Sequence, residues 1–248
     1  MQRVADPVEC RDCPLQDCPG LRRLEPDEIA YLQTFKQGEV IADRGERIIE
    51  QGQRVDRLFT LLDGLLIRFR ALEDGRRQIV NFMFPGDLVG LQGAFQEPAT
   101  HSVEPLLPSR LCVFERHRFH ALTVDRPELG FDLTWLAAKE ETALEEHIVA
   151  LGRRSARERV TYLAVWLLDR ALGTCMATGG NRLSVSITQA QIADMLGLSL
   201  VHTNRTIKAL EREGLVYWNQ REISVPDMTK ASDFANFDRQ LRRPRPFI

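Results

Sequence analysis

The sequence contains no apolar run long enough to cross a membrane, which takes about 18 consecutive apolar residues. The N-terminal text MQRVADPVECRDC also lacks the apolar core of a secretory signal, so the sequence predicts a cytoplasmic protein. Several catalytic motifs are missing as well: there is no GxSxG, no phosphate loop of the GxxxxGK type and no HExxH. These absences argue against a membrane protein and against the commonest classes of enzyme.

Lysine is scarce, since 29 of the 33 basic residues are arginine, and the charge is unevenly distributed. Residues 1–152 carry 18 basic and 26 acidic side chains, a net charge of -8, whereas residues 153–248 carry 15 and 9, a net charge of +6, which together give the overall -2. This asymmetry predicts that the C-terminal part contacts a polyanion, and arginine favours planar, bidentate contacts. The alternative is a solvated basic face without a partner.

The order of patterns along the chain predicts an α+β protein. Short apolar runs broken by glycine turns occupy the stretch from about 35 to 115, and Asp74 followed by Gly75 between two of them predicts a β-hairpin. Regularly spaced strands with few helices indicate an antiparallel barrel or jelly roll. We place this barrel at 25–126, after a cysteine-containing segment at 1–24.

A long helix is predicted over 127–152, because apolar residues there recur three or four positions apart. Such a seam suits a coiled-coil-like dimer contact, although packing against the chain's own barrel is the alternative. The predicted seam consists of Leu133, Leu136, Glu140, Leu144, Ile148 and Leu151.

Residues 153–228 have the pattern of a winged helix-turn-helix domain. Thr188 and Ser199 are placed to cap two short helices, and Gly197 lies where the turn between them needs a positive φ. Two short apolar runs then flank Asn219 as a hairpin. Helix, glycine turn, helix and hairpin in this order are typical of a DNA-binding domain.

This helix-turn-helix, preceded by a long apolar helix and a barrel with the text FPGDLVG, resembles the Crp/Fnr family of bacterial transcription regulators. The texts LTWLAAKEE, RRSARERV and LGLSLVHTNRTIKAL look like its Fnr-like, alphaproteobacterial-type branches. The resemblance implies a homodimer with a cupin-like sensory β-barrel (jelly roll), a central dimerisation helix and a winged C-terminal domain. It also implies palindromic double-stranded DNA and RNA polymerase as partners.

Cyclic nucleotide binding is not expected. In nucleotide-binding members of the family a Glu binds the ribose, and an Arg followed by Ser or Thr binds the phosphate. The matching positions here are Leu91, His101 and Ser102. Because an imidazole cannot replace a bidentate guanidinium on a phosphate, the resemblance implies a different signal.

The cysteines predict a metal or redox site. Cys10, Cys13 and Cys18 form a CxxCx4C group before the barrel, and the strand text LCVFE adds Cys112. Four thiolates suit an iron–sulfur cluster or zinc. Resemblance to the oxygen-responsive Fnr branch, in which three N-terminal cysteines and one barrel cysteine hold a [4Fe–4S] cluster, favours the cluster. A thiol-redox switch, another small-molecule effector and a protein without cofactor, controlled by its expression level, stay open.

Two further segments are expected to carry no function. Cys175 lies in the glycine-rich connector 173–181 with no partner nearby, and we expect it to be inert. The last residues, 238–248, belong to a C-terminal tail at 229–248 and are predicted to be disordered, because they are rich in Arg and Pro.

The start of the second short helix is expected to contact bases. In the family an Arg at the place of Arg205 contacts guanine, a pair that contributes roughly 1–3 kcal/mol of discrimination. Many members have a Glu where this chain has Val201, so the half-site should differ from the family's common ones. The predicted DNA-contacting set is Thr188, Gln189, Ser199, Val201, His202, Asn204, Arg205 and Lys208, of which Thr188, Gln189 and Lys208 are assigned to phosphates. Solvent-facing side chains are the alternative for this set.

Two other functional classes compete with a transcription regulator. A metal dioxygenase on the same barrel needs two or three His and a Glu at one metal, often starting from an H-x-H, which this sequence lacks. A cyclic-nucleotide module without DNA contact leaves the helix-turn-helix and the basic C-terminal part unexplained. We therefore predict a regulator and no enzyme.

Overall fold

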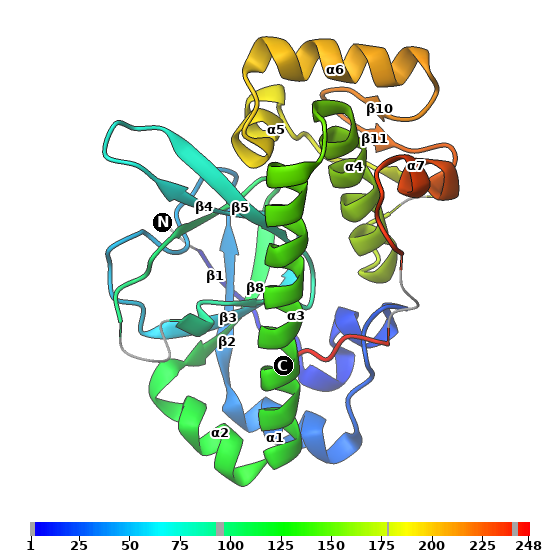
Figure 1. Cartoon of the computed structure of the whole chain (residues 1–248). Helices are drawn as coiled ribbons and strands as arrows, with labels where there is room; N and C mark the ends of the chain where they lie inside the picture. Colours follow the sequence, from blue (N-terminus) through cyan, green and yellow to red (C-terminus); the bar gives the residue numbers. More distant parts are fainter. Residues whose placement is uncertain (1–2, 93–96, 178, 240–242) are drawn as a thin grey trace.

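The computed structural model describes residues 3–92, 97–177, 179–239 and 243–248 (Figure 1). Two antiparallel sheets form the N-terminal part, and one long helix, α3 (Pro127–Arg153), runs beside them. The C-terminal helices lie at one end of α3, with α6 on the outer side (Figure 1). Among the described residues, no helix is long and apolar enough to span a membrane.

The two sheets of the sensory part have different strand orders. Among the described residues the larger sheet has the order β1-β2-β8-β3-β6 and the smaller one β5-β4-β7. The larger sheet contains β1 (Arg3–Ala5), β2 (Lys36–Ala42), β8 (Ser109–Glu115), β3 (Arg57–Asp63) and β6 (Leu88–Val89). The smaller one contains β5 (Arg77–Met83), β4 (Leu66–Ala71) and β7 (Ser102–Pro105). The predicted hairpin at Asp74 and Gly75 is confirmed, since β4 and β5 pair across it and Gly75 has a φ of 83°.

The prediction of a jelly roll is confirmed, but the sheets do not close into a barrel. The chain passes from β3 to β4 at Gly64, and β4 pairs only with strands of the smaller sheet in the part described. Gly64 has a φ of 101°, and a Cβ there would meet the backbone of Ser109 at 2.8 Å, so this turn requires glycine. The result is a two-layered sandwich with an apolar interior.

The helices follow local signals in the sequence. Before the sandwich lie η1 (Cys10–Asp12), η2 (Pro14–Asp17) and α1 (Pro26–Phe35); after it come η4 (Arg116–Arg118) and α2 (Phe119–Asp125). The C-terminal part contains α4 (Ala156–Gly173), β9 (Arg182–Leu183), α5 (Gln189–Leu196), α6 (Leu200–Arg212), β10 (Tyr217–Trp218), β11 (Ile223–Ser224) and α7 (Met228–Phe234). Proline opens α1 and α3, where the missing N–H costs no helical hydrogen bond.

One continuous apolar core joins the two parts of the molecule. It combines residues of the smaller sheet, such as Phe82 and Phe84, with buried residues of α4 and of the C-terminal helices. Trp166 of α4 packs edge-on against Phe84, with ring centroids 6.0 Å apart. The sensory sandwich and the C-terminal domain are therefore packed together.

The expectation of a disordered tail is wrong for residues 243–248. Phe247 and Ile248 are 2% and 5% exposed, in a second core formed with the N-terminal segment, α1, β8 and α3. The carbonyl oxygen of Ile248 accepts a hydrogen bond from Thr60 Oγ1 at 2.5 Å. Composition suggested disorder, but the last two residues are large and apolar and are buried. Residues 240–242 of the predicted tail lie outside the described residues.

Candidate functional site

The two short helices of the C-terminal domain are capped as the sequence predicts. The hydroxyl of Thr188 accepts a hydrogen bond from Gln191 N at 3.2 Å. In return, Thr188 N donates to the side-chain oxygen of Gln191, and the two bonds form a capping box. Ser199 accepts from His202 N at 3.2 Å at the start of α6. Gly197 between the helices has a φ of 62°, in the left-handed region that the turn requires.

One face of α6 is open to solvent and carries four of the eight predicted DNA-contacting residues. Val201, His202, Arg205 and Lys208 are exposed. The opposite face holds Thr203, Thr206, Ile207 and Leu210, all buried, which fixes the helix on the domain. Two helical turns beyond Arg205, at the end of α6, Arg212 is also exposed. An exposed stripe of arginine and lysine on a helix at the outer end of the molecule is the geometry that enters a major groove.

Gln189 and Asn204 differ from the rest of the set, because they bind each other. Asn204 Nδ2 donates to Gln189 Oε1 at 3.0 Å, and both side chains are half-buried. This bond links α5 to α6 and orients the amide of Asn204. The sequence prediction missed Arg221, which is exposed on the hairpin between β10 and β11; its place in a short hairpin after the second helix is the signal that identifies a wing residue.

The structure places the predicted dimer seam on two different faces of α3. Leu133 and Leu136 are each 4% exposed and pack inside the single chain, and the Glu140 carboxylate forms an ion pair with Arg68 of β4. Leu144 and Leu151 are half-buried, and Ile148 is 67% exposed. Phe131, on the outward side of the same helix, is 71% exposed. The outward stripe of α3 contains Phe131, Thr134, Ala138, Glu141, Glu145 and Ile148, all exposed.

Three of the predicted metal-binding cysteines lie together. Cys10 and Cys13 of the N-terminal segment pack against the apolar core that contains Cys112 of β8, which is 7% exposed. A buried ion pair lies beside them: Lys36 Nζ donates to Glu39 Oε1 at 2.5 Å, and their side chains are 4% and 0% exposed. The sequence prediction missed this pair, because two charged residues three apart at the start of a strand give no sign of burial.

The environment of these thiols favours their protonated form. Burial raises the pKa of Cys13 to about 11 and that of Cys112 to about 12, although the ammonium of Lys36 acts in the opposite direction. Burial also raises the pKa of Cys10. Burial alone would lower the pKa of Lys36, but its hydrogen bond to Glu39 and the negative charges beside it together raise the pKa. A metal would therefore have to displace thiol protons beside one fixed positive charge.

The fourth predicted ligand, Cys18, is bonded elsewhere. Its sulfur forms a disulfide with Cys175, with Cα atoms 5.3 Å apart and a separation of 157 positions along the chain. The expectation that Cys175 is inert and without a partner is thus wrong: the end of α4 packs beside the N-terminal segment, a contact that sequence distance conceals.

Cys10, Cys13, Cys18 and Cys112 can supply four thiolates to a metal group only when the Cys18–Cys175 disulfide is reduced. In the part of the chain that the structure describes, no three or more His, Cys, Asp or Glu side chains are grouped to hold a metal ion. Cys18 nevertheless belongs to the same apolar core as Cys112, with Cys10 and Cys13 packed against it. Reduction would return a fourth thiol to this core.

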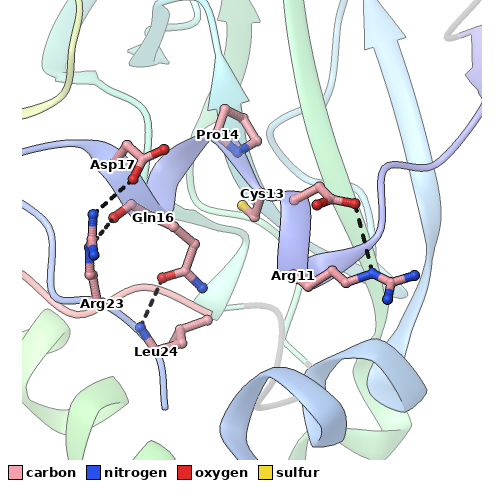
Figure 2. Close-up of a pocket in the computed structure, with 8 residues that line it drawn as sticks. Arg11, Cys13, Pro14, Gln16, Asp17, Arg23 and Leu24 are labelled. Carbon is pink, nitrogen blue, oxygen red and sulfur yellow. Dashed lines mark hydrogen bonds and ion pairs between the residues drawn. The ribbon is translucent and has the colours of Figure 1, made fainter. Parts of the chain in front are cut away.

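The N-terminal segment between the cysteines and α1 is held by its own hydrogen bonds (Figure 2). Arg23 donates to Asp17 Oδ1 at 2.9 Å and to the carbonyl oxygen of Gln16 at 3.1 Å, and Leu24 N donates to Gln16 Oε1 at 3.0 Å. The Cys13 sulfur lies close to this loop (Figure 2). These hydrogen bonds fix the course of the chain between Cys13 and α1.

The positions that bind nucleotide in other members have a different chemistry here. His101 is 7% exposed, and burial followed by the charges of Arg68 and Arg70 lowers its pKa to about 4, so its ring is neutral at physiological pH. The hydroxyl of Ser102 accepts from Gln51 N at 3.0 Å. A neutral ring and an occupied hydroxyl are poor partners for a phosphate.

Comparison with known proteins identifies the family. Residues 32–125 match the cyclic nucleotide-binding domain model, and residues 162–230 match the Crp-like helix-turn-helix domain model. The chain is 30% identical to the transcriptional activatory protein AadR of Rhodopseudomonas palustris over 193 residues, which cover 78% of this chain and 77% of AadR. The chain belongs to the Crp/Fnr family.

Other Crp/Fnr proteins match along nearly the whole chain. The transcriptional activator protein FnrL of Cereibacter sphaeroides is 28% identical over 232 residues, which cover 92% of each protein. The crystal structure of FixK2 from Bradyrhizobium japonicum superposes with a TM-score of 0.69 at 23% identity, over 79% of this chain and 96% of FixK2. As a member of the Crp/Fnr family, the protein is a DNA-binding transcription regulator rather than an enzyme, as the sequence predicted.

Proposed function

We propose that this Crp/Fnr protein is a cytoplasmic homodimer that binds a palindromic DNA site through α6, recruits RNA polymerase and responds to oxygen or redox state through its cysteines. The single observation that supports the DNA-reading part is the exposed stripe of Val201, Arg205 and Lys208 on a helix whose other face is buried. A two-fold axis would place two such helices about one turn of DNA apart, roughly 10 bp.

Within this set, Arg205 reads a base and Lys208 contacts phosphate. A guanidinium can donate two hydrogen bonds to O6 and N7 of one guanine, whereas an ammonium acts as a point charge on the backbone. Arg221 on the wing would add a phosphate contact. Val201 can contact only an apolar group such as a thymine methyl, so the half-site should contain a thymine opposite this side chain.

The test is a binding-site selection with the wild type and two matched variants. Arg205→Ala should weaken specific binding by roughly 1–3 kcal/mol and relax the preference at one symmetric G·C pair. Lys208→Ala should weaken all sequences alike and reduce the salt dependence of binding. If Arg205→Ala returned the wild-type motif unchanged, another residue would read the guanine.

For the sensory part, we propose that Cys10, Cys13, Cys18 and Cys112 hold an iron–sulfur cluster when Cys18 is reduced. The support is the grouping of three thiols in one apolar core, with Cys18 in that same core and the ammonium of Lys36 beside them. A [4Fe–4S] cluster, when bound, supplies a group that oxygen can destroy. The protein's part is to exclude water from the sulfurs.

Iron content and visible absorption of protein purified without oxygen test this proposal. We expect a brown protein with about four irons per chain and loss of most of the iron in Cys112→Ser, since every thiolate is needed. Cys175→Ser is the matched control, because it removes a cysteine outside the proposed set. A colourless wild type would overturn the cluster.

A further inference from the structure

The end of α4 is fastened to the N-terminal segment by a covalent bond. Cys18 comes just before α1, in the sensory part, and is 5% exposed. Cys175 follows the last turn of α4 and therefore belongs to the DNA-binding domain. Their disulfide is the covalent connection between these two parts besides the main chain itself.

The backbones on the two sides of the disulfide also contact each other, so hydrogen bonds hold these segments together in addition to the sulfur–sulfur bond. Gly20 N donates to the carbonyl oxygen of Gly173 at 2.8 Å, and the carbonyl oxygen of Gly20 accepts from Arg245 N at 2.7 Å. A Cβ at Gly20 would lie 2.6 Å from the Cα of Gly173, so no larger residue fits there. Three distant segments meet at this point, as Figure 1 shows for the blue N-terminal segment and the red C-terminal coil.

A buried carboxylate strengthens the same junction. Asp87 of the FPGDLVG text is 5% exposed and contacts Arg170 of α4 at 2.6 Å and Arg245 at 2.9 Å. Although burial opposes ionisation, these two guanidinium groups hold the pKa of Asp87 below its usual value. The carboxylate therefore links the sandwich to the DNA-binding domain and to the C-terminal segment.

The two cysteines differ in exposure. Cys175 is exposed and has a φ of 62°, in the left-handed region, whereas Cys18 is buried. Attack by a small thiol or a protein dithiol is therefore expected at Cys175. In a reducing compartment such a bond is transient and typically regulatory.

We propose that Cys18 and Cys175 form a redox-controlled clamp that holds the DNA-binding domain against the N-terminal segment, with α6 presented for DNA. Closing the clamp oxidises two thiols to one disulfide; the two electrons and two protons pass to a low-molecular-weight disulfide, which is reduced to two thiols. A dithiol reverses the step. We take the linked form as the DNA-binding form, since Val201 and Arg205 of α6 are exposed in it.

The clamp rests on the DNA-binding part of the proposed function. It competes with the proposed iron–sulfur cluster, because both need the sulfur of Cys18. Cys18 has one sulfur, so a chain whose Cys18 is bonded to Cys175 lacks the fourth ligand of the proposed cluster. Oxidation of Cys18 would therefore exclude the cluster and close the clamp in one step.

The experiment uses the full-length protein without metal, treated with glutathione disulfide or with dithiothreitol. Peptide mapping should find a Cys18–Cys175 peptide only in the oxidised sample. The oxidised wild type should bind the palindrome selected by this protein several-fold more tightly than the reduced one, because the clamp raises the fraction of molecules in the binding-competent arrangement. Cys175→Ser should bind equally under both conditions, at the affinity of the reduced wild type.

Three results would overturn the clamp: no Cys18–Cys175 peptide after oxidation, equal affinity of the oxidised and reduced wild type, or weaker binding by the oxidised form. Cys112→Ser separates the two proposals. This variant loses a cluster ligand and keeps both clamp cysteines, so it should retain the redox response of the wild type. A colourless wild type that still shows this response would overturn the cluster and support the clamp.

Discussion

His147 of α3 lies where the sandwich, α3 and α4 meet, and its ring is 5% exposed. Tyr162 of α4 donates its hydroxyl proton to Nδ1 at 2.8 Å, and Nε2 lies 3.4 Å from Asn81 Oδ1 of β5. The Asn81 amide in turn donates to both carboxylate oxygens of Glu140, at 2.9 and 3.1 Å. This arrangement suits a neutral ring that accepts at one nitrogen and donates at the other.

Stability should fall as the pH is lowered, because His147 is neutral in the folded protein. Burial, followed by the charges of Arg68 and Arg154, lowers its pKa from 6.5 to about 4. The unfolded chain binds a proton below pH 6.5, so the stabilisation is full above that value and is lost as the pH falls toward 4. Between pH 7 and pH 5 the loss from this residue should be about 2 kcal/mol.

Denaturant unfolding of His147→Gln at both pH values checks this expectation. The variant should be less stable at pH 7, because the hydrogen bonds are altered, but its stability should decrease less between pH 7 and pH 5 than that of the wild type. His120→Gln is the control, since that ring is exposed. His101 is buried with its pKa lowered to about 4 and keeps its own share of the pH dependence in both variants. An unchanged pH dependence in His147→Gln would show that the ring is not the source.

At the scale of elements, the sequence predicted those whose signals are local. Thr188, Gly197 and Ser199 define α5 and α6 through caps and one turn, each within a few residues. Asp74 and Gly75 define the β4–β5 hairpin in the same way. These features could be read from spacing, because the interactions that decide them join residues close in the chain.

Elements whose partners are distant were harder to predict. The spacing of apolar residues in α3 is compatible both with contact to a second copy and with packing in the chain's own core. The structure places Leu133 and Leu136 in that core. The partner of Glu140, Arg68, is 72 residues away. Cys175 and the last two residues also find their partners across the whole chain, and composition cannot indicate such contacts.

At the scale of the whole molecule, we expect two copies to meet through the outward stripe of α3. Phe131 and Ile148 expose 71% and 67% of their surface at two places along this helix, and Glu141 and Glu145 lie between them. If two parallel copies of α3 met on this face, Phe131 and Ile148 would be buried and the carboxylates of Glu141 and Glu145 would come close to those of the other copy. A further negative charge on this face should then weaken the association of the two subunits.

Ile148→Glu should therefore convert the dimer to monomers. The variant places two unpaired carboxylates in an apolar contact, which costs several kcal/mol and raises the dissociation constant at least about a hundredfold. Sedimentation measures the oligomeric state, and DNA binding should weaken in parallel because one half-site is lost. Val124→Glu is the matched control, since Val124 is 62% exposed on α2 and lies outside the outward stripe of α3. If Ile148→Glu stayed dimeric while Val124→Glu dissociated, the subunits would meet through α2 instead of the outward stripe of α3.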